Sequence, residues 1–147
     1  MSEWRARAII EAQSWIGTPF HHGADLKGIG VDCGQLVFAV YRNIGVLADE
    51  KFPSYDPRWM LASENSFLED LFRARFDLAE APQPGDAMLF RAGRNYCHLG
   101  IVTTPEPLKI IHAASEYGFV LEEEAAQSSR FARRLAEALI GRPKGQK

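Results

Sequence analysis

The chain has 147 residues, 46% of them apolar, and a formal net charge of -2, which is the composition of an ordinary globular domain. This charge balance excludes a protein that binds nucleic acid through a broadly basic surface. The sequence has no apolar run near the ~20 residues of a membrane helix and no signal-peptide pattern at its N-terminus. We therefore expect residues 1–147 to fold as a single domain, synthesised in the cytoplasm, with no nucleic-acid partner and no membrane segment.

The first half of the sequence predicts helices separated by loops. Helices are expected over residues 2–16, 33–44 and 66–76, and loops over residues 17–31 and 46–65. Ser2 is placed to cap the first helix, and Gly45 ends the second. The third begins with the capping-box pattern Ser66-Phe67-Leu68-Glu69.

The second half predicts strands. Short apolar or alternating runs separated by turn residues are Ala87–Phe90, Cys97–Thr103, Leu108–Ala113 and Phe119–Glu122. Residues 123–141 suit a helix, but Arg134–Ile140 also suits an edge strand. A basic cluster follows, which fits either a solvated face or a docking surface. Because helices come first and an antiparallel sheet follows, the predicted fold class is α+β.

A reactive cysteine is predicted at the start of the second helix. Asp32 is a good N-cap, and Gln35 stands three residues later, where a capping box has Glu or Gln. Cys33 is then the first helical residue, at the positive end of the helix dipole, where the pKa of a thiol is lowered. The Cys33 backbone N–H is a candidate to hold the oxyanion of a tetrahedral intermediate. The alternative is a small buried apolar residue.

A base for Cys33 is sought among the four histidines of the sequence. His98 and His112 lie on neighbouring predicted strands, joined by the turn Thr104-Pro105-Glu106-Pro107. A hairpin centred on Pro105 places the two histidines directly opposite each other, with Cβ atoms about 4.5–5.5 Å apart. His112 then orients His98 toward the thiol, as the third member of a catalytic triad does. Each histidine taken alone is equally well explained as a core or surface residue.

A zinc site is the competing interpretation of Cys97, His98, His112 and one of the pair His21 and His22. No CxxC or HExxH spacing supports it, and adjacent strand residues such as Cys97 and His98 point to opposite faces. Two cysteines are also too few for a disulfide framework in a chain of this size. We therefore predict no metal and no cofactor, with Cys97 as a packing residue.

Taken together, the motifs resemble those of the NlpC/P60 family of papain-like cysteine peptidases. They are Trp15-Ile16-Gly17-Thr18-Pro19-Phe20, Gly30-Val31-Asp32-Cys33, Pro84–Phe90, His98-Leu99-Gly100-Ile101-Val102 and Ile110-Ile111-His112-Ala113, in family order. The resemblance implies a nucleophile helix packed on an antiparallel sheet. It also implies a thiol protease that degrades peptidoglycan by cutting stem peptides next to D-isoglutamate, with Cys33 as nucleophile, His98 as base and His112 as orienting residue.

The compact form resembles the phage and prophage branch of that family. This implies tail proteins as partners and action at the cell wall through a virion or tail assembly. Two features depart from the family pattern: the pair Gly34-Gln35 stands where members have Ser-Gly or Trp-Gly, and Phe20 replaces Tyr. Gln35, Asp32 and Phe20 are candidate substrate-binding residues, and His21 and His22 are either substitutes for the missing tyrosine or plain loop residues.

Two other functions fit the same sequence. The changed Gly34-Gln35 pair and Phe20 favour a non-catalytic structural or binding module of a phage tail. Papain-like folds also carry amidases and acyltransferases that act on other amides, for which a long apolar acyl pocket would be expected.

Overall fold

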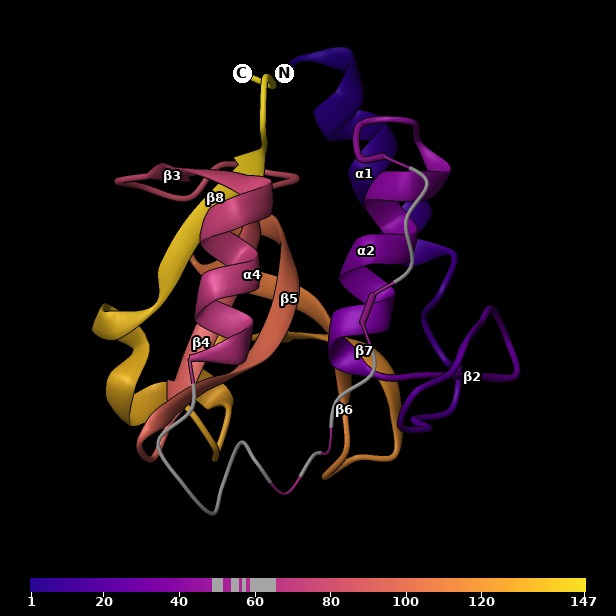
Figure 1. Cartoon of the computed structure of the whole chain (residues 1–147), viewed down its shortest axis with the longest axis vertical. Coiled ribbons are helices and arrows are strands. Elements are labelled where there is room, and N and C mark those ends of the chain that lie inside the picture. The colour runs from indigo at the N-terminus through magenta and orange to yellow at the C-terminus, as the bar shows by residue number, and fades with distance from the viewer. Residues whose placement is uncertain (49–51, 54–55, 57, 59–65) are drawn as a thin grey trace.

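The computed structural model describes residues 1–48, 52, 53, 56, 58 and 66–147, and in it the helices pack on one face of an antiparallel sheet (Figure 1). The helices are α1 (Glu3–Gln13), α2 (Cys33–Asn43) and α4 (Phe67–Arg75). Two short 3-10 helices, η1 (Ala125–Gln127) and η2 (Ala132–Glu137), follow the last of the predicted strands. No described helix has the length and apolar character needed to cross a membrane.

The predicted helices are present, but their ends differ from the sequence patterns. Ser2 and Ser66 stand at the N-cap positions of α1 and α4, yet neither side chain makes a capping hydrogen bond. Ser66 instead donates to the Asp70 carboxylate at 2.8 Å, so the predicted capping box does not form. The first helix stops at Gln13, and Ile16, expected on its buried stripe, is 47% exposed. Most of the predicted loop 46–65 lies outside the described residues.

The main sheet has the strand order β3-β8-β4-β5-β6-β7. Its strands are β3 (Phe76–Ala79), β4 (Ala87–Ala92), β5 (Asn95–Pro105), β6 (Leu108–Ala114), β7 (Phe119–Glu124) and β8 (Leu139–Pro143). A two-stranded sheet, β1 (Asp25–Leu26) with β2 (Gly30–Val31), lies within the predicted loop 17–31. The predicted strands are confirmed and slightly longer, and the α+β class is confirmed.

The segment after β7 corrects the edge-strand interpretation. Residues 132–137 form η2, and β8 follows it. β8 is an interior strand, because it pairs with β3 on one side and with β4 on the other. β3, which the sequence analysis missed, occupies the edge instead.

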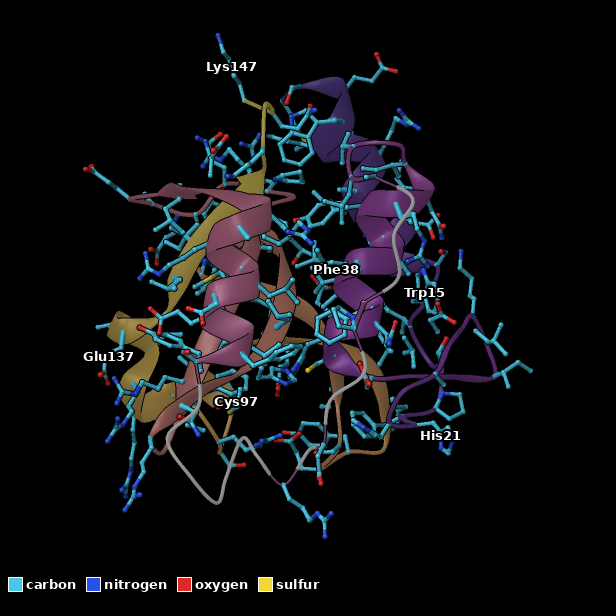
Figure 2. The ribbon with its side chains drawn as sticks, in the orientation of Figure 1. Trp15, His21, Phe38, Cys97, Glu137 and Lys147 are labelled. Atoms are coloured by element: carbon cyan, nitrogen blue, oxygen red, sulfur yellow. The ribbon has the colours of Figure 1, made fainter. Side chains whose placement is uncertain are left out.

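Strand alternation gives the sheet two different faces. Leu89, Leu99 and Ile101 join the larger core cluster with α1, α2 and α4. Phe90 and Val102 point the other way and pack with Phe131, which precedes η2. Figure 2 shows Phe38 pointing from α2 toward α4, where its ring meets the rings of Phe52 and Phe76.

One turn, at residues 83–86, connects both N-terminal helices to the sheet. Asp86, fully buried, pairs with Arg5 of α1 at 2.8 Å and with Arg142 of β8 at 2.9 Å. The Tyr41 hydroxyl of α2 donates to the Gly85 carbonyl at 2.7 Å. This turn therefore fixes where α2 lies on the sheet.

Replacing Asp86 with alanine should destabilise the protein strongly. Two guanidinium groups would lose their carboxylate in a buried site, which typically costs about 3–5 kcal/mol of unfolding free energy. Urea unfolding measures this loss. The control is Glu69→Ala, which breaks an exposed ion pair with Arg73 and should change stability by less than about 1 kcal/mol. Equal effects of the two substitutions would contradict the role given to the turn.

Candidate active site

Cys33 is the first residue of α2, and Asp32 caps the helix as predicted. The Asp32 carboxylate accepts hydrogen bonds from the Gln35 N–H at 2.9 Å and from the Gly23 N–H at 2.7 Å. The side chain of Gln35 does not complete a capping box, because its Nε2 donates to the Phe52 carbonyl at 3.4 Å. Its Oε1 is buried and has no hydrogen-bond partner among the described residues. The capping bonds leave the Cys33 N–H free of the Asp32 carboxylate.

The thiol of Cys33 lies where β5 and β6 separate. Pairing between these strands runs from the turn as far as Ile101 and Ile111. Beyond that point the Leu99 N–H, which a partner strand would otherwise use, hydrogen-bonds the Cys33 sulfur. The nitrogen of Leu99 is covalently bonded to the carbonyl carbon of His98. The thiol is therefore placed against the peptide that joins His98 to Leu99.

His98 and His112 are in direct contact. The Nε2 of His98 lies 2.6 Å from the Nδ1 of His112, with the rings nearly perpendicular at 85°. The predicted register is wrong, however, because β5 continues to Pro105, the turn is Glu106-Pro107, and a bulge interrupts the pairing between Val102 and Thr104. His112 consequently faces Gly100, where an added Cβ would lie 3.4 Å from its own. His98 reaches His112 diagonally instead of directly across.

Glu123 extends this contact by one residue and was missed in the sequence. Its Oε1 lies 2.8 Å from the Nε2 of His112, so the three side chains form one hydrogen-bonded series across β5, β6 and β7. The register pairs His112 with Leu121, which makes Glu123 its diagonal neighbour. Strand alternation could have indicated Glu123, because it puts Glu123 on the same face of β7 as Leu121. Linking that face to His112 required the register of the hairpin between β6 and β7, which the sequence does not give.

Aromatic rings cover the histidines on the face away from α2. The Phe131 ring stacks on His98 with 5.2 Å between centroids, and Phe90 lies on another side. Burial therefore lowers the pKa of His98 well below its usual value, and the nearby His112 and Arg130 add to the effect. Burial also lowers the pKa of His112 to about 4. Both imidazoles are neutral at pH 7.

The thiol is neutral as well, which corrects the sequence expectation. Cys33 is only 6% exposed, and burial raises its pKa to about 12, with a further contribution from the Asp32 carboxylate. The Leu99 N–H acts in the opposite direction but is outweighed. The sequence predicted that the helix N-terminus lowers the pKa of Cys33, and this prediction is wrong because burial outweighs the helix dipole. The resting arrangement is a neutral thiol against the peptide after His98, and the neutral His98 ring packs with Phe90 and Phe131.

Phe52 explains one departure from the family pattern. A Cβ placed on Gly34 would lie 2.4 Å from the Phe52 ring. That ring also makes an edge contact with Phe38 at 5.0 Å, so it is held in the core. Glycine follows Cys33 because an aromatic ring from a distant part of the chain fills the space of a side chain.

The remaining candidate residues surround the helix start. Phe20 packs partly buried against the core, and its N–H donates to the Gly118 carbonyl at 2.8 Å. The Nδ1 of His22 lies 3.6 Å from the Asp32 carboxylate, while His21 lies on the neighbouring loop (Figure 2). Cys97 packs in the core cluster, on the face opposite His98. Within the described ranges, no group of three or more histidine, cysteine or acidic side chains is arranged to hold a metal ion.

These groups suit acyl transfer by a thiol. Such chemistry needs a nucleophile, a base in contact with an orienting group, and N–H donors for an oxyanion. The described residues include groups of these kinds: a helix-capped thiol, a pair of neutral imidazoles in contact, and the first N–H of α2.

Comparison with solved structures identifies the fold. The NlpC/p60 domain of the peptidoglycan hydrolase SagA aligns over 94% of this chain and 97% of that chain, with a TM-score of 0.60 and 16% identity. A protein similar to lipoprotein, of the NLP/P60 family, from Staphylococcus aureus subsp. aureus Mu50 aligns over 97% of this chain and 42% of that one (TM-score 0.63, 20% identity). The peptidoglycan hydrolase RipB from Mycobacterium tuberculosis aligns over 95% and 64% (TM-score 0.56, 16% identity). The chain has the fold of NlpC/P60 domains.

Comparison of sequences adds nothing to this result. No protein-family model matches the chain, and no curated protein matches it.

Adding a methyl group at position 34 should destabilise the protein only while Phe52 is present. Gly34→Ala forces the Phe52 ring to move, and such overpacking costs roughly 1–3 kcal/mol, more than the ~1 kcal/mol that alanine gains over glycine in a helix. In a Phe52→Ala background the same substitution should be neutral or stabilising. A double-mutant cycle by urea unfolding measures the difference. Independent, additive effects would refute the contact as the reason for glycine.

Alkylation of Cys33 should be slow at neutral pH. With Cys97 replaced by serine, iodoacetamide reports only Cys33, and a pKa of about 12 leaves little thiolate at pH 7. We expect the rate to keep rising with pH beyond the value of ~8.5 typical of a free thiol. The same variant unfolded in guanidinium is the control and should titrate near that value. A plateau below pH 8 in the folded protein would show that the thiol is activated at rest.

Proposed function

We propose that this protein is a cysteine endopeptidase that hydrolyses amide bonds in peptidoglycan stem peptides. The observation that carries the proposal is the juxtaposition at the β5/β6 separation, where the Cys33 thiol lies against the peptide after His98 and His98 contacts His112 at 2.6 Å. The likeness in fold to domains of peptidoglycan hydrolases supports the choice of substrate. Cleavage next to D-isoglutamate is the bond expected from the family resemblance.

The reaction begins with a proton transfer, since the resting thiol is neutral. His98 takes the Cys33 proton on Nδ1, the nitrogen that His112 does not contact, while the sulfur attacks the scissile carbonyl carbon. The Cys33 N–H at the start of α2 stabilises the resulting oxyanion. When the C–N bond breaks, His98 returns the proton to the leaving amine, and a thioester with Cys33 remains.

Water completes the cycle through the same groups. His98 removes a proton from the water molecule as it attacks the thioester carbonyl, and the C–S bond then breaks. The proton passes from His98 to the departing sulfur, which restores the neutral thiol. His112 keeps its contact with His98 throughout and holds the ring in one orientation.

We further propose that the protein reaches the cell wall as part of a phage or prophage tail. The resemblance of its compact motif arrangement to that branch of the family supports this. Co-sedimentation of the chain with virions, detected by antibody, tests it; a chain found only in the lysate supernatant would contradict it.

A non-catalytic module is the second candidate. The deep burial of Cys33, 6% exposed and with a raised pKa, is the observation that favours it. The two functions differ in whether the protein releases peptides from purified wall material.

Activity on muropeptides should depend on Cys33 and His98 but not on Cys97. Cys33→Ala removes the nucleophile, and His98→Ala removes a base whose contribution is about 10²–10⁴ in rate. Digestion of purified peptidoglycan, with products separated by liquid chromatography, measures both. Cys97→Ala serves as the matched control, because it also removes a buried thiol but should keep activity. Digestion by Cys33→Ala at the wild-type rate would refute the mechanism, and an inactive, folded wild type would establish the non-catalytic module.

A further inference from the structure

We infer that Glu123 is a positioning residue for the His98–His112 pair, fixing which nitrogen of His112 carries the proton and thereby leaving one nitrogen of His98 free as a base. The inference rests on the proposed function for its kinetic consequences, but its structural content concerns the two histidines alone. It adds the Glu123 carboxylate to the three candidate residues predicted from the sequence, which are Cys33, His98 and His112.

The direction of each hydrogen bond follows from the carboxylate. An ionised carboxylate only accepts, so the Nε2 of His112 donates its proton to Glu123 across 2.8 Å. A neutral imidazole has one N–H, so the Nδ1 of His112 is an acceptor. It receives the Nε2–H of His98 across 2.6 Å. The Nδ1 of His98 is then unprotonated, which is the state that a base for Cys33 requires.

Glu123 is the carboxylate in direct contact with His112, and the contact is shielded from water. The His112 side chain is fully buried, and that of Glu123 is 13% exposed. The Tyr117 hydroxyl donates to the second oxygen of Glu123 at 3.3 Å, which holds the carboxylate in place from the turn before β7. The other charged groups that act on the histidines are Glu116 and Arg130, which pair with each other at 3.8 Å.

Loss of the carboxylate would change the chemistry of His98. Without an acceptor at its Nε2, His112 is free to carry its proton on Nδ1 instead. The Nδ1–H of His112 would then donate to the Nε2 of His98, which reverses the direction of the hydrogen bond. Because the Nε2 of His98 is now an acceptor, the proton of the neutral His98 ring must be on Nδ1. In this tautomer His98 has no lone pair for the Cys33 proton. No proton passes to Glu123 at any stage; its charge stabilises the imidazolium that forms on His98 through the neutral His112.

Three variants separate these effects. Glu123→Ala removes both the acceptor and the charge, and Glu123→Gln removes the charge but keeps an acceptor oxygen. Glu124→Gln, a neighbour on β7, is the control for charge alone. Imidazole ¹⁵N shifts report the tautomer of each histidine independently of activity, and the pH dependence of kcat/KM on muropeptides reports the base.

We expect the wild type, Glu123→Gln and the control to show the Nε2–H tautomer of His112, and Glu123→Ala to lose it. For Glu123→Ala, kcat should fall roughly 10- to 100-fold, a part of the 10²–10⁴ that acid–base catalysis contributes. A negative charge favours the protonated imidazole, so removing it lowers the pKa of the base. The acid limb of the profile should therefore move to lower pH in Glu123→Gln and stay in place in the control.

An unchanged His112 tautomer in folded Glu123→Ala would overturn the inference, as would an unshifted acid limb in Glu123→Gln. Neither result would affect the proposed function if Cys33→Ala remains inactive. Conversely, a wild type with the expected tautomer but no hydrolysis would overturn the proposed function and leave the positioning role intact.

Discussion

The separation of β5 from β6 beyond Ile101 and Ile111 is the constraint on which the candidate site depends. A continuous ladder would use the Leu99 N–H for pairing. Because the strands diverge, the Leu99 N–H faces the Cys33 sulfur. The Cys33 side chain therefore lies against the peptide between His98 and Leu99, whereas the His98 ring lies on the other face of the sheet.

Burial determines the electrostatics of these groups. Each member is removed from water, so each is held in its neutral form: the thiol by a raised pKa and the imidazoles by lowered ones. A neutral thiol and neutral imidazoles avoid the cost of burying an isolated charge. In the proposed reaction, charge is therefore created only when the proton moves, and the Cys33 N–H and Glu123 are the groups that would stabilise it.

Local patterns were enough to predict the parts of the site but not their relation. Asp32 and Cys33 follow from helix capping, which involves neighbours in the sequence. The contact between His98 and His112 was predicted from a register that is wrong, and it forms because long side chains also meet diagonally. Glu123 and the Phe52 ring over Gly34 depend on contacts between distant segments. The pKa of Cys33 was mispredicted because its burial comes from the packing of the whole sheet.

The two ends of the chain lie side by side, and an Arg5 guanidinium N–H donates to the Lys147 carbonyl at 3.2 Å (Figure 1). They occupy the pole of the molecule opposite the N-terminal end of α2, where Cys33 begins the helix (Figure 1). Anything joined covalently to either end would thus emerge far from the thiol. A tether at either end would therefore hold the chain by the side away from the start of α2.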